Sequence, residues 1–474
     1  MISDAIAAQV RKNLGHVPTA GQDRVIDRLA EFVFGPDDRI FLIRGYAGTG
    51  KTTLVASLVR SLEGYRIKTV LLAPTGRAAK VMASYSGASA FTIHKKIYRQ
   101  RKVVEGFGEF SLDRNLHRNT LFIVDEASMI SNQSLDLSAF GSGRLLDDLI
   151  TYVYSSPGCR LVLIGDDAQL PPVGFDQSDA LRSEYLERYG MKVESATLTE
   201  VVRQAGDSGI LHNATRLREL LSRESLPKSL PQLDIKGFPD ICQVTGESLL
   251  EELERSYASV GTGETMVVCR SNKLANRYNK GIRDRILSYE EDIRLGDLIM
   301  VVRNNYHWLK DSPEIDFIAN GDILEVVRTH KGRDLYDLHF RDLTLRFTDY
   351  REMEFEARVM LDALYSETPA LDREQMRNFF AAVALDYQHM KGKKHKTDAI
   401  REDPYFNALQ IKFSYAVTCH KAQGGQWKHV FIDQGYISEE TADREYYRWL
   451  YTAITRATEK VFLVNFKPEF FTPR

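Results

Sequence analysis

The sequence predicts an α/β fold with two doubly wound parallel sheets, a β-hairpin inserted in the first half and a small β-barrel inserted in the second. Three observations favour it. Short apolar strands alternate with helical patterns from about residue 20 to 180, a second alternating region begins near 195, and residues 296–350 consist of short, closely spaced strands. Strand–helix alternation implies right-handed crossovers between parallel strands, whereas closely spaced strands are typical of an antiparallel barrel.

In the first region, each apolar strand ends at a polar or glycine-rich segment, which is where parallel sheets bind their ligands. Residues 98–120 interrupt the alternation with two short strands that turn at Gly106 or Gly108, and they predict a projecting hairpin. The strands expected for the first sheet are Ile40–Ile43, Thr69–Ala73, Leu121–Val124 and Arg160–Ile164.

The second region supplies a second sheet and encloses the barrel. Residues 351–390 are expected to be helical, and Lys391–Lys396 to form a basic loop. The sheet strands expected are Thr265–Cys269, Val430–Ile432 and Lys460–Val464, and the barrel strands are Asp297–Val302, Gly321–Val327, Leu335–Phe340 and Thr344–Phe347. These patterns divide the chain into residues 1–180, with 98–120 as the hairpin, then 181–299 with 411–474, and 300–410 as the insertion.

Bulk composition narrows the class of protein. The 474 residues carry a net charge of −2, so any nucleic-acid binding must depend on a local groove. Four scattered cysteines form no C-x-x-C pair, which favours reduced core residues over a zinc site or a disulfide framework. The N-terminus has no signal-peptide pattern and no apolar run is long enough to cross a membrane, so a soluble cytoplasmic protein is expected.

Residues 45–53 form a complete G-x-x-x-x-G-K-[ST] loop between a strand and a helix, the context that phosphate binding requires. Lys51 is expected to reach the β and γ phosphates of ATP, and the Thr52 hydroxyl to ligate Mg²⁺. A chance glycine turn is the alternative. The residues expected to hold the nucleotide here are Gly45, Ala47, Gly48, Thr49, Gly50, Lys51, Thr52 and Thr53.

Two further strands end in groups suited to hydrolysis. Asp125 and Glu126 follow a buried strand, where Asp125 is expected to hold Mg²⁺ and Glu126 to orient or deprotonate the attacking water. Gln169 follows the next strand, and its amide can donate to a γ-phosphate and accept from water. Taken alone, the first pair could be a solvated loop and the second segment a structural proline turn.

Together these motifs resemble superfamily 1 DNA helicases, most closely the RecD-like and Dda-like subgroup, superfamily 1B, which moves 5′ to 3′. The resemblance spans about residues 19–465 and implies two RecA-like domains and an SH3-like barrel. It is carried by Thr19–Gln22, the phosphate loop, Leu72–Lys80, Thr92–Lys95, Asp125–Ser128, Gly165–Gln169, Leu198–Arg203, Val417–Gly424 and Tyr451–Ala457.

The resemblance assigns further roles at the nucleotide. Gln22 would read the adenine edge, although a helix-start glutamine is the alternative. Arg203 and Arg456, from the second half, would act as arginine fingers that neutralise charge on the transferring phosphoryl group. Gln426 would contact the ribose, at a position where the family often has a carboxylate.

The resemblance also implies a DNA path across both halves, in which phosphates are gripped without reading sequence. Ordinary capping or core histidines are the alternative for His94 and His420. The first half would contribute Pro74, Thr75, Arg77, Thr92 and His94, and the second half Thr418, His420 and Lys421.

The inserted hairpin carries Phe107 and Phe110, either of which could stack on the last base pair as a strand-separating pin. The equal alternative is that both phenylalanines pack the hairpin onto its host. The barrel would contact the translocating strand or brace the hairpin.

The sequence therefore predicts an ATP-dependent DNA helicase that uses Mg²⁺ and binds single-stranded and forked DNA. A monomer suffices for this architecture, and the oligomeric state is left open. An ATP-switched binding protein and an RNA helicase are the alternatives, and a small-molecule kinase is disfavoured because it has no need of Arg203 and Arg456. Repair, replication and recombination all suit such an enzyme, and no pathway is singled out.

Overall fold

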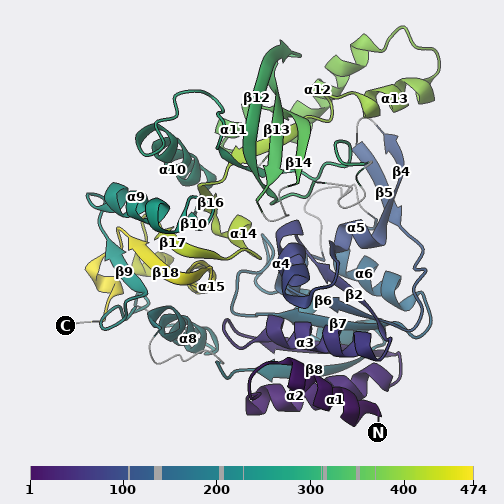
Figure 1. Ribbon diagram of the computed structural model, residues 1–474, viewed down its shortest axis with the longest axis vertical. Coiled ribbons are helices and arrows are strands. Elements are labelled where there is room, and N and C mark those ends of the chain that lie inside the picture. Colours follow the sequence, from purple (N-terminus) through teal and green to yellow (C-terminus); the bar gives the residue numbers. More distant parts are fainter. Residues whose placement is uncertain are drawn as a thin grey trace.

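The computed structural model describes residues 2–104, 107–132, 141–201, 208–227, 229–310, 312, 318–348, 353–368 and 370–472. Its first sheet has six parallel strands in the order β3-β2-β6-β7-β1-β8 (Figure 1). All four predicted strands of this sheet are confirmed. The strands are β1 (Arg39–Gly45), β2 (Lys68–Ala73), β3 (Ala90–Thr92), β6 (Thr120–Val124), β7 (Arg160–Gly165) and β8 (Lys192–Leu198).

Helices cover both faces of this sheet because its buried strands are apolar on both sides. Ile43 and Ile123 pack with the helices α1, α2 and α3, while Leu42 and Phe122 pack with α5 and α6 on the opposite face. The helices of this half are α1 (Ile2–Asn13), α2 (Ala20–Phe34), α3 (Lys51–Gly64), α4 (Gly76–Ser86), α5 (Ile93–Ile97), α6 (Leu145–Tyr154) and α7 (Ser183–Leu186).

The first sheet extends further along the chain than the sequence indicated. Strand β8 pairs in parallel with β1 along its whole length, although the predicted boundary at residue 180 placed it in the second half. Only Ala196 and Leu198 of this strand are buried and its other positions are exposed or partly buried, as expected of an edge strand, so the apolar run that marks the inner strands is missing.

The predicted hairpin is present as the antiparallel pair β4 (Tyr98–Val104) and β5 (Phe107–Leu112). It rises from the first sheet toward the helices of the inserted region (Figure 1).

The second sheet has five parallel strands in the order β16-β10-β17-β18-β9. The three predicted strands are confirmed. The elements of this half are α8 (Gly209–Leu221), β9 (Ile241–Val244), α9 (Leu249–Val260), β10 (Thr265–Cys269), α10 (Asn272–Arg285), β16 (Ala416–Thr418), α14 (Cys419–Ala422), β17 (Trp427–Asp433), α15 (Arg444–Ile454) and β18 (Ala457–Val464).

The inserted barrel is closed and has five strands, which confirms the predicted inserted barrel. It is mostly antiparallel, but β14 and β15 pair in parallel. Its core is continuous with one face of the second sheet, because Ile299 and Leu324 belong to the same apolar cluster as Val267 and Phe431. The strands are β11 (Leu298–Val301), β12 (Ile323–Leu335), β13 (Leu338–Phe347), β14 (Glu354–Met360) and β15 (Leu409–Phe413).

Three predictions in the insertion were wrong. The predicted strands 335–340 and 344–347 are not separate, because residues 338–347 form one long strand, β13. Leu335 ends β12, and Tyr336 and Asp337, both with φ 58°, form the tight turn between the two strands. Residues 354–360 form β14 instead of a helix, and most of the basic segment 391–396 lies in a helix. The helices here are α11 (Asp362–Tyr365), α12 (Arg373–Asp386) and α13 (Lys393–Glu402).

Across the described ranges, no helix combines the length and the apolar character that crossing a bilayer requires.

Candidate functional site

The phosphate loop joins β1 to α3 in the expected geometry. Gly48 and Gly50 have φ of 77° and 78°, a conformation that glycine adopts without strain. Gly50 caps α3 without any side-chain hydrogen bond, so the first N–H groups of that helix are available to an anion. A Cβ at Gly45 would lie 2.8 Å from the Lys51 side chain, which explains the glycine there.

Lys51 folds back over this loop. Its Nζ donates to the carbonyl of Gly45 and, at 3.0 Å, to that of Tyr46. The cation therefore lies at the centre of the loop, and a bound phosphate would compete with these two carbonyls for it. Thr52 and Thr53 lie in the first turn of α3, both partly buried.

The predicted acidic pair lies at the end of β6. The Asp125 carboxylate accepts the Glu126 N–H at 2.8 Å, and burial, reinforced by the charge of Glu126, raises the pKa of Asp125 to about 6. Glu126 has φ 53°, which is strained for a residue with a side chain and is typical of functional sites. Thr52 and Asp125 are a hydroxyl and a carboxylate, the oxygen ligands that Mg²⁺ prefers.

The segment after β7 is buried against the second half of the molecule. Ala168 and Leu170 belong to the apolar core of the second sheet. The Leu170 N–H donates to the Thr452 hydroxyl at 2.9 Å, and its carbonyl accepts from the Gln423 amide at 2.8 Å. Gln169, between them, is 5% exposed, and its Oε1 has no hydrogen-bond partner among the described residues.

Tyr451, on α15, connects this segment to the phosphate loop. Its hydroxyl donates to Asp166 at 2.6 Å and accepts from the Ala47 N–H at 2.9 Å. Burial raises the pKa of Asp166, and the hydroxyl counteracts part of this rise. Tyr451 and Thr452 belong to the motif Tyr451–Ala457, but the sequence alone indicates a role for neither. The signal was present, since both lie in the segment that ends at Arg456.

Gln22 is fully buried, and both ends of its amide are engaged. Its Oε1 accepts the Thr19 N–H at 3.1 Å, which completes a capping box at the start of α2, and its Nε2 donates to the Thr49 carbonyl at 3.0 Å. The helix-start alternative thus describes its position here, and its contact with Thr49 braces the phosphate loop. Reading of adenine by Gln22 stays a prediction.

The predicted arginine fingers cannot be compared, because Arg203 lies outside the described residues. Arg456 is 4% exposed and donates to the carbonyls of Thr452 and Gly425 at 3.1 and 3.3 Å. Gln426, the predicted ribose contact, is exposed after the turn formed by Gly424 and Gly425.

The two predicted halves of the DNA face meet in the structure. A Cβ at Gly424 would lie 2.9 Å from the Ala78 Cβ and 3.2 Å from the Thr75 hydroxyl. The Arg77 guanidinium lies 4.1 Å from the centre of the Trp427 ring. The start of α4 therefore packs on the turn that follows α14. Three more of the predicted DNA contacts lie close in the sequence to these segments and are partly buried: Pro74, Thr418 and Lys421. Burial lowers the pKa of Lys421.

Two of the predicted DNA contacts also hold local structure. Thr75 caps α4 and Thr92 caps α5, through hydrogen bonds to Ala78 N and Lys95 N, both at 3.2 Å. Burial lowers the pKa of His94 to about 4 and also lowers that of His420, so His94 is neutral at pH 7. His94 can therefore offer a hydrogen bond to DNA but not a charge.

Of the two hairpin phenylalanines, the structure describes the side chain of Phe110 alone. Phe110 packs on the core beneath the hairpin, and its ring centre lies 5.6 Å from that of Tyr306, in the loop after β11. This position fits packing and bracing by the barrel region. The Phe107 side chain lies outside the described part of the chain, so a pin at Phe107 stays a prediction.

Comparisons with known proteins agree with this geometry. Residues 19–228 match the AAA domain family, and residues 413–464 match the UvrD-like helicase C-terminal domain family. The ATP-dependent DNA helicase dda of Enterobacteria phage T4 is 26% identical over 449 residues, which cover 89% of this chain and 93% of that protein.

Two further similarities span nearly the whole chain. The ATP-dependent RecD2 DNA helicase of Deinococcus radiodurans is 23% identical over 470 residues, 97% of this chain and 50% of that protein. A crystal structure of the Pif1 helicase from Bacteroides in complex with ADP-AlF3 and ssDNA has a TM-score of 0.49 and 17% identity, and covers 97% of this chain and 95% of that one.

Proposed function

Because the chain belongs to the superfamily 1B helicases, of the RecD-like and Dda-like type, we propose that it hydrolyses ATP to move 5′ to 3′ along single-stranded DNA and to unwind the duplex ahead. Its substrates are single-stranded and forked DNA, and a monomer suffices. Its four cysteines are free, which suits the reducing cytoplasm as the compartment.

The observation that carries the proposal is the direct bonding between the nucleotide loops and the second half. Tyr451 binds Asp166 and Ala47, while Thr452 and Gln423 bind Leu170. Gln423 follows the segment 418–421 predicted to grip DNA. A change at the γ-phosphate would therefore shift the second half of the DNA face, which is the coupling that a motor requires.

In the proposed hydrolysis, Glu126 orients and deprotonates a water whose oxygen bonds to the γ-phosphorus, while the bond from that phosphorus to the β,γ-bridging oxygen breaks. Lys51 holds the β and γ phosphates, and Gln169 senses the γ-phosphate. Arg203 and Arg456 neutralise developing charge as the two halves close.

The metal belongs to the same proposal. Thr52 and Asp125 would hold Mg²⁺, which supplies positive charge against the phosphate oxygens. Asp125 has a pKa raised to about 6, so it is mostly ionised at pH 7 and able to act as a ligand.

For the DNA, Pro74, Thr75, Arg77, Thr92 and His94 form the first part of the path and Thr418, His420 and Lys421 the second. Hydroxyl groups, backbone N–H groups and single cations grip phosphates without regard to sequence, as movement along a strand demands.

The decisive experiment measures unwinding of two forked substrates, one with only a 5′ single-stranded tail and one with only a 3′ tail, with ATP and Mg²⁺. We expect unwinding only from the 5′ tail. Unwinding restricted to the 3′ tail would contradict the polarity, and DNA binding with negligible ATP turnover would favour an ATP-switched binding protein instead.

Lys51→Ala is the negative control, because it removes the cation that holds the phosphates. We expect it to abolish turnover and to leave weak DNA binding. Lys68→Ala, at an exposed position at the start of β2, is the matched control and should behave as the wild type.

A further inference from the structure

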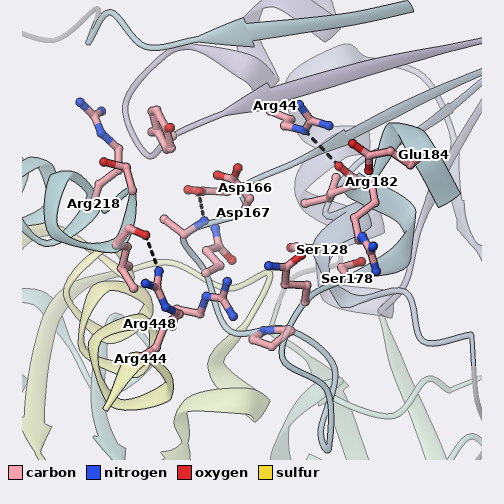
Figure 2. Close-up of a pocket in the computed structure, with 18 residues that line it drawn as sticks. Arg44, Ser128, Asp166, Asp167, Ser178, Arg182, Glu184, Arg218, Arg444 and Arg448 are labelled. Atoms are coloured by element: carbon pink, nitrogen blue, oxygen red, sulfur yellow. Dashed lines mark hydrogen bonds between the residues drawn. The ribbon is translucent and has the colours of Figure 1, made fainter. Parts of the chain in front are cut away.

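A cavity of about 530 Å³ lies behind the phosphate loop, between the two halves of the molecule (Figure 2). Its lining includes Tyr46 of the loop, residues 166–169 after β7, and side chains from α8 and α15. Arg44 also lines it. Because Ile43 packs toward α3, its neighbour Arg44 points to the opposite face of the sheet. The cavity is therefore on the far side of the loop from the helix that receives the nucleotide.

The inner end of the cavity holds buried polar atoms without partners. Gln169 Oε1 and Ser128 Oγ have no hydrogen-bond partner among the described residues, and these residues are 5% and 2% exposed. A buried polar atom without a hydrogen-bond partner destabilises the folded chain, so a polar occupant is expected beside these two atoms. Since Gln169 is also the proposed sensor of the γ-phosphate, this end adjoins the place where the γ-phosphate would lie.

Arginines from both halves surround the rest of the cavity. Figure 2 shows Arg44 and Arg182 on one side and Arg218, Arg444 and Arg448 on the other. Among the described residues, only Arg182 of these five has a carboxylate within 4.0 Å, that of Asp179 at 3.6 Å. The cavity reaches solvent, because two of its lining residues are exposed: Gln177, in the loop after β7, and Ser222, directly after α8.

Three carboxylates also line the cavity, those of Asp166, Asp167 and Glu184. Asp166 is held by the Tyr451 hydroxyl and the Ala168 N–H, and Asp167 and Glu184 are exposed near the outer end. Five cations against three anions attract an oxyanion without holding it tightly. A path must bind its ion weakly enough to release it, and this balance suits passage better than storage.

We propose that this cavity is the exit path for inorganic phosphate after ATP cleavage, while ADP still occupies the phosphate loop. The inference rests on the proposed function and adds a second opening to the same site. The phosphate passes from Gln169 and Ser128 to the arginines and leaves between Gln177 and Ser222.

The test compares cleavage with release in one turnover on single-stranded DNA. Rapid quenching measures ATP cleavage, and a fluorescent phosphate-binding protein measures free phosphate. In Arg182→Ala and in Arg218→Ala, we expect release to slow at least about fivefold, from the loss of a charged contact, with cleavage within about twofold of the wild type. Unchanged release, or equal slowing of both steps, would overturn the inference.

Two variants narrow the outlet without removing charge. Gln177→Trp and Ser222→Trp add bulk at exposed lining positions, one in each half of the molecule, so each should slow release and spare cleavage. Arg255→Ala is the matched control, because Arg255 is an exposed arginine of α9 that pairs with Glu251 and Glu252 of its own helix, and it should alter neither step.

A binding measurement separates this inference from the proposed function. Radiolabelled inorganic phosphate is titrated into the full chain with Mg-ADP, which requires no hydrolysis. We expect the wild type to bind phosphate and Arg182→Ala/Arg218→Ala to bind it at least about fivefold more weakly. Absent or unchanged binding overturns the exit path even when DNA-stimulated hydrolysis is normal, whereas a lack of hydrolysis with this binding intact contradicts only the proposed function.

Discussion

Among single residues, Tyr451 has an unusual position, since one hydroxyl serves two loops of the other half. It donates to Asp166 and accepts from Ala47, and the residue is fully buried. Burial and the neighbouring Asp166 raise the pKa of Tyr451 well above its ordinary value, so the hydroxyl stays protonated and remains a donor. A phosphate that bound the Ala47 N–H would compete with this hydroxyl for one of its two partners.

We expect Tyr451→Phe to lower the free energy of unfolding by about 1.5–3 kcal/mol, because a buried hydrogen bond to a carboxylate is lost. DNA-stimulated ATP turnover should fall as well, while DNA binding without nucleotide should stay within about twofold. Urea denaturation and steady-state kinetics measure these effects. Tyr447→Phe is the control, because Tyr447 lies on the same helix and its hydroxyl donates only to the backbone carbonyl of Ser229 among the described residues. An equal loss of turnover in that variant would contradict the assignment.

His94 should make the stability of the fold depend on pH. Its pKa is lowered to about 4 in the folded chain from 6.5 in the unfolded chain, so between these values the unfolded state binds a proton that the folded state does not. Stability therefore falls as the pH drops through this window, by at most about 3 kcal/mol, and is unaffected above it.

The measurement is urea denaturation at pH 7 and pH 5 of the wild type and of His94→Gln. We expect the wild type to lose up to about 2 kcal/mol more than the variant between these pH values. An equal loss in both proteins would show that His94 titrates normally.

For single residues, the sequence predicted a role where residue type and position in a motif are enough to indicate it, as for Lys51 and Asp125. It could not predict the bond from Tyr451 to Asp166, because the two residues are 285 positions apart and meet only when both halves have folded. Nor could it predict that Gln22 braces Thr49, since a capping glutamine and an adenine-reading glutamine have the same spacing to the loop.

Among the elements, α4 joins the first sheet to the barrel region as well as to the second half. Lys80 pairs with Asp322 at 3.1 Å, and both side chains are at most 5% exposed. The Lys80 ammonium also lies 4.7 Å from the centre of the Phe347 ring. The barrel is thus attached to α4, whose N-cap is Thr75 and whose first turn contains Arg77.

We expect Lys80→Met to lower the free energy of unfolding by about 3–5 kcal/mol, because Asp322 would stay buried without its cation. Lys80→Met/Asp322→Asn should recover more than half of that loss. Lys428→Met is the control, since the pair of Lys428 with Glu459 is about half exposed and should contribute less than about 1 kcal/mol. A similar cost at both sites, measured by urea denaturation, would refute the role of burial.

Strand and helix predictions succeeded where the apolar pattern has one period and failed where it is mixed. The sequence predicts a helix over β14 because Met360, Leu361 and Leu364 have the spacing of one apolar helical face, but Met360 ends the strand and only Leu364 lies in α11. The basic run 391–396 predicts a loop because it contains no apolar residue, whereas the apolar contact of α13 comes later in that helix, from Ile400.

For the whole molecule, the net charge of −2 excludes general attraction to DNA, so binding must come from the local face. Binding to single-stranded DNA should weaken as salt rises, with a slope of log K against log salt of about −0.7 for each phosphate neutralised.

Lys421→Ala should reduce the magnitude of this slope by about 0.7, because one phosphate contact is lost, and should weaken binding equally for different sequences. Fluorescence anisotropy over a range of salt concentrations measures both. The control is Lys467→Ala, an exposed lysine beyond β18, which should leave the slope unchanged. An unchanged slope in Lys421→Ala would remove Lys421 from the DNA face.

The strand order of the two sheets also determines when each sheet can form during translation. All six strands of the first sheet lie within residues 39–198, so this half can fold while the ribosome is still translating the rest. In the second sheet, β9 and β10 are not neighbours, and every strand that either one pairs with lies beyond residue 415. The apolar strand Thr265–Cys269 therefore has no partner strand until about 150 further residues have been synthesised. During that interval the nascent chain depends on chaperones, or on the early-folding half, to keep this strand from aggregating.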